Sequence, residues 1–125
     1  MLPAAHRLRS AADFQDVIRR GVKASRGAVV VYVLAADERD PSQAIRPARV
    51  GTVVSKKVGG SVTRHRAARR IRGAAAPLLK DLPTGCRVVI RALPGADTDP
   101  SLAVDLRTAI TLGVERSPQV SRGSR

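Results

Sequence analysis

The apolar residues of this chain recur with two different periods, and the changes of period predict strands and helices. The run 28–34 is continuously apolar and rich in Val, which is typical of a strand buried on both faces. In 48–55 the residues alternate between two sets, which predicts a strand with two different faces. One set is Val50, Thr52 and Val54, and the other is Arg49, Gly51 and Val53. Gly51 leaves space on its face for the close approach of another group.

Other segments place apolar residues three and four positions apart, which is the spacing of one helical face. The first of these follows Ser10, the expected N-cap, with Asp13 three residues on as its partner. This helix is expected to end at Gly21. A later helix is expected after Asp99 as N-cap, with Pro100 at its first position. Its apolar residues are Leu102, Leu106, Ala109, Ile110 and Gly113.

The order of these elements predicts the fold class. A third strand is expected over 87–92, and the polar segment 36–47 is expected to be a hairpin loop between the first two long strands. The sequence of elements is then helix, two or three strands, helix, strand, helix. This order favours an α+β domain, a two-layer sandwich with helices packed mainly on one face of a small sheet. We expect one domain over 1–114 and a mobile basic tail over 115–125.

The central helical segment, 61–78, has an apolar side and a strongly basic side. Gly59 and Gly60 interrupt the preceding run, and Ser61 is the expected N-cap. The apolar side carries Ala67, Ala68, Ile71, Ala74, Ala75 and Leu78. The basic side carries His65, Arg66, Arg69, Arg70 and Arg72, and Arg64 lies toward the apolar side of the first turn. Arginines near a helix N-terminus, and an Arg66–Arg70 pair four apart, are locally unfavourable. A bound polyanion would compensate for both, and a solvated basic face is the alternative.

The charge of the whole chain favours a nucleic-acid partner. The net charge is +13, and all but four of the 23 Lys and Arg residues are Arg. From residue 41 to residue 80 there are ten basic residues and no acidic one. A membrane-surface helix is less favoured, because the apolar side of 61–78 is mostly Ala. The chain has neither a run of eighteen apolar residues nor a signal-peptide pattern, so we expect a cytoplasmic protein with no membrane partner.

Residue types that carry catalysis are sparse. Cys86 is the only cysteine, which excludes an intrachain disulfide and a Cys-based zinc cluster, and it is expected to be buried. His6 and His65 are the only histidines, and neither has a carboxylate or thiol at ligand spacing. We therefore expect no catalytic residue, no metal site and no cofactor bound by the protein itself.

The segment from Ser55 to Arg72 resembles the signature of bacterial ribonuclease P protein components. Those proteins carry a strand ending in Ser-Lys-Lys, a Gly, and then a helix that opens with Arg-Asn-Arg and continues with spaced Lys and Arg. The matching residues here are Ser55, Lys56, Lys57, Gly59, Arg64, Arg66, Arg69 and Arg72. His65 stands where the family usually has Asn, and Ala68 stands where it often has Lys. The resemblance extends over residues 6–112 and includes an Asp-Phe-x-x-Val pattern at Asp13.

The resemblance implies a function and a set of site residues. It implies the protein subunit of ribonuclease P, an RNA-binding partner of a catalytic RNA that holds the catalytic centre and its magnesium ions. The protein would hold the 5′ leader of precursor tRNA and promote its endonucleolytic removal, with no obligate protein partner. The implied RNA-binding residues are Lys56, Lys57, Arg64, His65, Arg66, Arg69, Arg70 and Arg72. The implied leader cleft comprises Phe14, Ile18, Lys23, Arg26 and Tyr32, with Ile18 where a second Phe is common.

Several alternatives stay open. A small ribosomal protein would share the charge and the fold but would have no effect on precursor tRNA cleavage. A DNA-binding module is less favoured, because the basic helix contains no Asn or Gln to read base edges. Phe14 is either a stacking surface for bases or a core anchor. General connectivity rules favour a right-handed crossover through the basic helix, whereas the resemblance implies a left-handed one.

Overall fold

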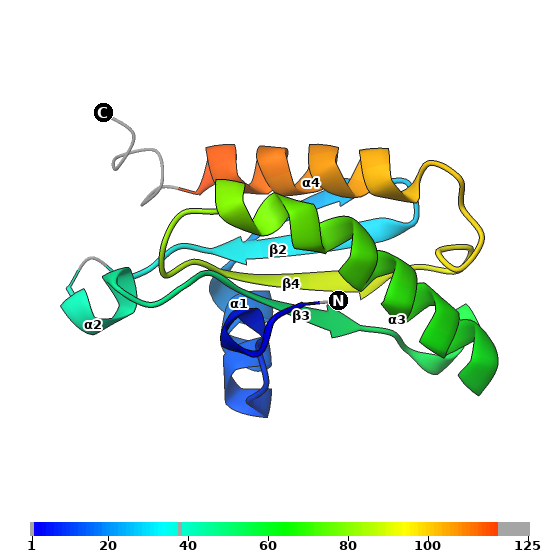
Figure 1. The fold of residues 1–125 in the computed structure, drawn as a ribbon, viewed down its shortest axis with the longest axis horizontal. Coiled ribbons are helices and arrows are strands. Elements are labelled where there is room, and N and C mark those ends of the chain that lie inside the picture. Colours follow the sequence, from blue (N-terminus) through cyan, green and yellow to red (C-terminus); the bar gives the residue numbers. More distant parts are fainter. Residues whose placement is uncertain (1, 38, 118–125) are drawn as a thin grey trace.

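A four-stranded mixed sheet forms the centre of the molecule in a computed structural model that describes residues 2–37 and 39–117 (Figure 1). The strands are β1 (Val22–Arg26), β2 (Val29–Leu34), β3 (Arg49–Val53) and β4 (Arg87–Ala92). Their order across the sheet is β1-β2-β4-β3. β2 pairs antiparallel with both β1 and β4, whereas β3 and β4 are parallel.

The helices cover the two faces of this sheet unequally. The α-helices are α1 (Ala11–Arg20), α2 (Pro41–Ala44), α3 (Ser61–Ala75) and α4 (Leu102–Arg116). Three short 3-10 helices accompany them: η1 (Ala4–His6), η2 (Lys56–Val58) and η3 (Ala76–Asp81). α3 and α4 lie side by side on one face, and α1 crosses the opposite face (Figure 1). The predicted α+β class is confirmed, with α1 as the one long helix outside the main helical layer.

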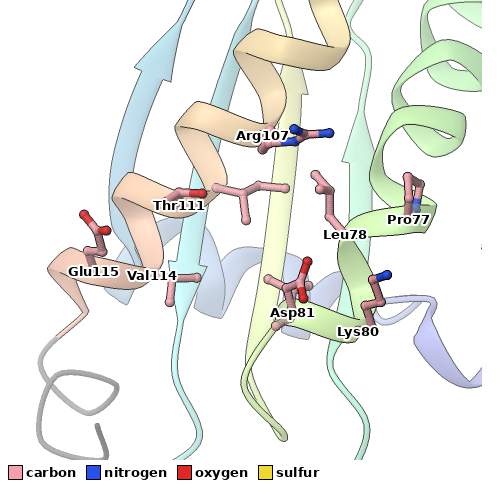
Figure 2. A pocket seen from close by; sticks show the side chains of 10 residues that line it. Pro77, Leu78, Lys80, Asp81, Arg107, Thr111, Val114 and Glu115 are labelled. Atoms are coloured by element: carbon pink, nitrogen blue, oxygen red, sulfur yellow. The ribbon is translucent and has the colours of Figure 1, made fainter.

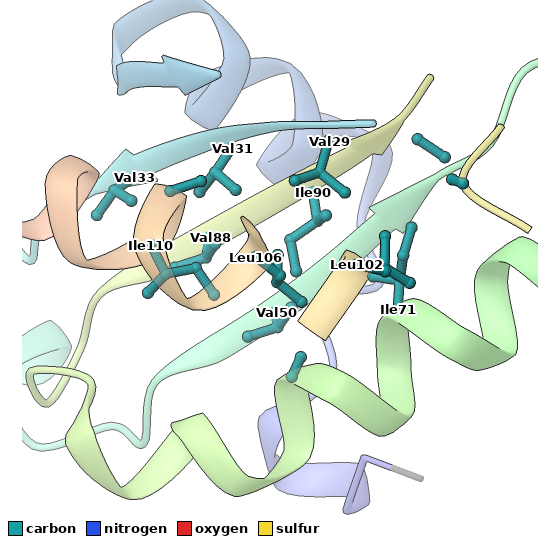
Figure 3. Packing of buried hydrophobic residues seen from close by; sticks show 14 of the residues in the cluster. Val29, Val31, Val33, Val50, Ile71, Val88, Ile90, Leu102, Leu106 and Ile110 are labelled. Atoms are coloured by element: carbon teal, nitrogen blue, oxygen red, sulfur yellow. The ribbon is translucent and has the colours of Figure 1, made fainter. Parts of the chain in front are cut away.

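The main core lies between the sheet and the α3–α4 layer. Alternate residues of β2 enter it, and Val88 and Ile90 of β4 lie beside them (Figure 3). Leu102 and Leu106 of α4 pack onto these strands and are at most 2% exposed. Full burial of each such side chain contributes about 1.5–3 kcal/mol. The remaining residues of β2 enter a smaller cluster under α1, so β2 is buried on both faces, as its continuous apolar run predicts.

The connection from β3 through α3 to β4 has the less common hand. β3 and β4 are parallel neighbours, so the chain must cross over between them. Seen from the side of α3 and α4 with both strands pointing upward, β4 lies to the left of β3 (Figure 3). The crossover is therefore left-handed, as the family resemblance implies and against the general preference.

Two sequence predictions about helix starts are wrong, and one is confirmed. Ser10 caps α1, where its hydroxyl accepts a hydrogen bond from the Asp13 N–H. Ser61, in contrast, is the first residue of α3, because the N-cap position belongs to Gly60. Asp99 accepts a hydrogen bond from the Ser101 N–H in the turn before α4, so the helix begins at Leu102.

The predicted hairpin over 36–47 is also wrong. β4 lies between β2 and β3, so the segment links two strands that are not neighbours. Part of it forms α2, whose N-cap is Asp40. At the other end of the chain, α4 continues through Arg116, two residues past the predicted domain boundary. The rest of the predicted tail, 118–125, lies outside the described residues.

Candidate RNA-binding surface

The basic side chains of α3 divide into two sets that face different neighbours. Ala67, Ile71 and Ala75 bury the opposite side of the helix, so its charged residues project away from the sheet. On one flank Arg70 donates hydrogen bonds to the carbonyls of Ala96 (2.9 Å) and Asp99 (2.6 Å). Arg70 therefore holds the loop between β4 and α4, and this guanidinium is already occupied by protein acceptors.

Arg66 lies on the same flank, but contacts within the protein constrain its side chain less. Its side chain is 51% exposed and lies 4.0 Å from the carboxylate of Asp97. An ion pair at that distance and exposure contributes little. His65, the residue before Arg66, is exposed. Arg64 is half-buried, and its buried Nε has no hydrogen-bond partner among the described residues.

Lys56 and Lys57 precede α3 in η2, and both are exposed. The turn that follows them depends on Gly59, whose φ of 150° is unfavourable for side-chain-bearing residues. A Cβ at this position would also lie 2.8 Å from Cγ2 of Thr63 in α3. Gly59 thus fixes how the two lysines stand relative to the first turn of the helix.

The other flank of α3 faces a groove of about 700 Å³ at the outer edge of β3. Its charged and aromatic lining comprises Arg7, Arg9, Phe14, Arg69 and Arg72. These residues come from the N-terminal segment, α1 and α3, which converge on β3. No acidic residue is among those that line the groove, so it is a concave surface of uniformly positive charge.

Phe14 is both a packing residue and a wall of this groove. Its ring lies against the backbone of Gly51, and a Cβ there would overlap the ring. This close approach is the one that the glycine in the strand predicts. Phe14 is half-buried and belongs to the edge of the cluster under α1. Packing on Gly51 confirms the core-anchor alternative for part of the ring, while base stacking on the rest of it stays a prediction.

An ion-pair network that the sequence analysis did not identify holds α1 on the sheet. Arg87, buried at the start of β4, donates to Asp13 (2.8 Å) and to Asp16 (2.9 Å) on α1. Arg49, its partner across the sheet, reaches Asp13 at 3.4 Å, and Arg20 donates to Asp16 at 2.6 Å. The hydrogen bond from Arg20 is the main cause that lowers the pKa of Asp16, while burial lowers the pKa of Arg49. The sequence feature that could have indicated this network is the spacing of Asp13 and Asp16, which lie three residues apart and therefore on one side of a helix.

The other residues of the predicted leader cleft are distributed differently. Lys23 and Tyr32 are cross-strand partners on the sheet face that α1 crosses, in the same row as Gly51. Tyr32 is only 7% exposed, and Ile18 on α1 is 42% exposed. Neither these three nor Arg26 line the groove beside Phe14.

Arg26 lies on the wrong face of the sheet for the predicted cleft. It pairs with Val29, whose side chain enters the core under α4, and its guanidinium lies 4.0 Å from Asp105 of α4. The register of β1 separates Arg26 from Lys23, because their separation of three residues puts them on opposite faces.

A second hollow, of about 590 Å³, lies between η3 and α4 (Figure 2). Leu78 and Val114 give it an apolar lining, while Lys80, Asp81 and Arg107 bring charges of both signs. It shares no lining residue with the basic groove. Its mixed charge gives no reason to assign an anionic ligand to it.

The described residues show neither a metal-binding cluster nor a membrane span. No three or more His, Cys, Asp or Glu side chains among them are grouped so that they could hold a metal ion. Within the same part of the chain, no helix is long and apolar enough to cross a membrane.

Comparison with known proteins identifies the relatives of this chain. The family model described as ribonuclease P matches residues 2–111. The ribonuclease P protein component of Streptomyces bikiniensis is 46% identical, covering 88% of this chain and 93% of its own length. That of Mycobacteroides abscessus is 38% identical, covering 94% and 91%. A Staphylococcus aureus RNase P protein mutant shares the fold, with a TM-score of 0.72 at 24% identity over 86% of this chain and 87% of the other. The fold, the basic helix and the similarity over nearly the whole described chain lead to one assignment: the chain belongs to the ribonuclease P protein family.

Proposed function

We propose that this chain is the cytoplasmic protein subunit of ribonuclease P, which binds ribonuclease P RNA and the 5′ leader of precursor tRNA. In this role it promotes the endonucleolytic cut that gives the mature tRNA 5′ end, the known role of the family. The observation that carries the proposal is the convergence of α3, the N-terminal segment and Phe14 on one positively charged groove. Such a groove combines phosphate neutralisation with a stacking surface, the two requirements for binding a single strand.

The basic residues outside the groove supply the contacts to the RNA subunit. Lys56, Lys57, His65 and Arg66 are exposed in η2 and the N-terminal turns of α3 and make up the α3 surface. Lys and Arg at such positions release counterions from the RNA on binding. Phosphate contacts of this kind position the RNA without reading its sequence. Arg70 acts indirectly, because it holds the loop that follows β4.

The protein contributes binding and positioning to the reaction, and we assign the catalytic centre and its Mg²⁺ to the RNA subunit. Neutralising the backbone lets two polyanions, the RNA subunit and the substrate, approach each other closely. A bound leader is held in one orientation relative to the RNA, which converts a flexible end into a positioned one. Both effects come from the groove and the α3 surface.

Reconstitution tests the proposal directly. The protein is mixed with ribonuclease P RNA and labelled precursor tRNA at low Mg²⁺, where phosphate repulsion is least screened. We expect cleavage at the mature 5′ end that depends on the protein and falls when Arg66 and Lys57 are both changed to Met. A protein that binds RNA tightly yet leaves cleavage unchanged at every Mg²⁺ concentration would instead be a permanent RNA-binding protein of the ribosomal kind.

A further inference from the structure

The α1 helix is attached to the sheet by few apolar side chains. Among its residues, all of which the structure describes, only Val17 is buried, and the half-buried Phe14 packs at the edge of the cluster beneath the helix. Polar contacts add to this attachment. The guanidinium of Arg87, a residue only 7% exposed, donates from Nη1 to Asp13 at 2.8 Å and from Nη2 to Asp16 at 2.9 Å.

The two hydrogen bonds from Arg87 act on two points of α1, and two points fix a rotation as well as a position. Asp13 and Asp16 are three residues apart, so they lie on the same side of the helix. A guanidinium is planar and rigid, so it holds the two carboxylates at a set separation. Arg87 is itself held in place, because it pairs with Leu34 of β2 on one side and with Arg49 of β3 on the other. The rotation of α1 about its own axis is therefore referred to the centre of the sheet.

Phe14 follows Asp13 directly, so the rotation of α1 also sets the direction of the Phe14 ring. Successive residues of an α-helix lie about 100° apart around its axis, so a rotation of the helix moves the ring across β3. Arg49 reaches Asp13 at 3.4 Å, and the ring lies on Gly51, two residues farther along the same face of β3. The contact that fixes the helix thus lies next to the contact that places the ring.

The geometry of this network depends on Arg87 more than its charge does. Without Arg87, Asp13 would keep Arg49 and Asp16 would keep Arg20, so each acid would still have a cation nearby. Among the described residues, however, only Arg87 bonds to both acids. Its loss would leave each carboxylate partly compensated but would remove the link between the two.

We propose that Arg87 is a positioning residue for the substrate: by holding Asp13 and Asp16 together it sets the rotation of α1, and with it the direction in which Phe14 meets a base of the leader. The inference rests on the proposed function and adds to it a residue that is buried beneath α1 and acts only through that helix. A gap of about 1 Å between the ring and a base would remove up to about half of their dispersion energy. A small rotation of α1 is therefore enough to weaken stacking.

The test measures the affinity of the holoenzyme for precursor tRNA with a leader of several nucleotides, divided by its affinity for mature tRNA. The protein is saturating, so that weakened assembly with the RNA subunit does not enter. Arg87→Met removes the link between the two acids, and Arg87→Lys keeps the charge and part of the contact. Asp16→Asn weakens one of the two contacts and serves in place of Arg87→Met if that variant does not fold. Leu106→Ala, in the core on the opposite face of the sheet, controls for a loss of stability alone.

We expect Arg87→Met to lower this affinity ratio about fivefold, the low end of what one stacked base contributes, and Asp16→Asn to lower it less. Arg87→Lys should restore part of the ratio, and Leu106→Ala should leave it at the wild-type value. In a Phe14→Ala background, Arg87→Met should cause no further fall, because the ring on which it acts is absent. A merely structural role of Arg87 would not produce this dependence on Phe14.

Three results would overturn the positioning role while leaving the proposed function intact. They are a wild-type ratio in the folded variants at positions 87 and 16, an equal fall in Leu106→Ala, and an effect of Arg87→Met that is as large without the Phe14 ring as with it. A wild-type holoenzyme that binds precursor and mature tRNA equally well would instead contradict the proposed function itself.

Discussion

The ring of Phe14 lies directly on the backbone of Gly51, so α1 and β3 meet where β3 has no side chain. This contact, together with the buried Val17 and the ion pairs of Arg87, determines where α1 crosses the sheet. The same contact fixes one wall of the basic groove. A change at position 51 therefore acts on stability and on the groove at once.

Gly51→Ala should destabilise the protein by about 1–3 kcal/mol, because the added methyl group must displace the Phe14 ring or the strand. Gly73→Ala is the matched control, since a Cβ there meets nothing within 4 Å and the residue lies inside α3. That change should stabilise the protein by about 0.5–1 kcal/mol. Urea unfolding of both variants measures the difference, and similar effects of the two substitutions would contradict the contact.

Arg70→Met and Arg66→Met should separate a structural arginine from an RNA-binding one. Arg70→Met leaves the carbonyls of Ala96 and Asp99 without their donor and should cost about 1–3 kcal/mol of stability. Arg66→Met should change stability by less than about 0.5 kcal/mol and should weaken binding of ribonuclease P RNA. Thermal melting and RNA titration of both proteins check this, and a reversed pattern would exchange the two roles.

Phe14→Ala should lower the affinity for precursor tRNA relative to mature tRNA. Stacking of one base on an aromatic ring contributes about 1–3 kcal/mol. The half-buried ring also packs on Gly51, so we expect some loss of stability, smaller than the roughly 3–5 kcal/mol of a fully buried Phe. Holoenzyme titrations with both tRNAs, below the melting transition of the variant, measure the ratio. An equal loss for the two tRNAs in a folded variant would argue against stacking.

Binding to the RNA subunit should weaken steeply with salt. If the exposed Lys and Arg side chains neutralise about six phosphates of the RNA, the slope of log K against log salt concentration should be about −4 to −5. Changing Lys56 and Lys57 to Met should make the slope shallower by about one to two. A slope near zero would show that the charge of this surface does not drive association.

The ion pairs that hold α1 should respond to acid. The hydrogen bond from Arg20, and then that from Arg87, lowers the pKa of Asp16 below its ordinary value of 3.8. The folded protein therefore binds this proton less readily than the unfolded chain, so the stabilisation is present above pH 3.8 and is lost as the pH falls through the lowered pKa. A double-mutant cycle of Asp16→Asn and Arg87→Met, followed by urea unfolding at pH 7 and pH 3, should show a smaller coupling at pH 3 than at pH 7. Coupling of equal size at both values would contradict a charged Asp16.

Local patterns in the sequence predict the elements of this fold well, because each pattern depends on burial within a few turns. The continuous apolar run of β2, the two faces of β3 and the apolar face of α4 are all found where their periods place them. The cap at Ser10 is correct because it is a contact between residues three apart. The cap assigned to Asp99 is wrong because its side chain is used in a turn just before the helix.

The order of the strands in the sheet, and the contacts between residues far apart in the sequence, could not be predicted from such local patterns. The position of β4 between β2 and β3 depends on contacts between segments more than thirty residues apart, which loop composition does not reveal. Helical spacing places Arg70 on the basic side of α3 but cannot show that a loop with two free carbonyls lies opposite it. The face of Arg26 depends on the register of β1, and the role of Arg87 depends on a helix that precedes it by about seventy residues.

The place of β4 in the sheet also determines when the sheet can assemble during synthesis of the chain. β4 is the last strand to leave the ribosome, yet it supplies the pairing partner of both β2 and β3. Until residue 92 has emerged, the β1–β2 hairpin and β3 each expose an unpaired edge, the kind of edge on which chains associate wrongly. The complete sheet therefore forms only after β4 has been synthesised, and the arginine-rich helix α3, which precedes β4 in the chain, is made before the sheet that will support it exists.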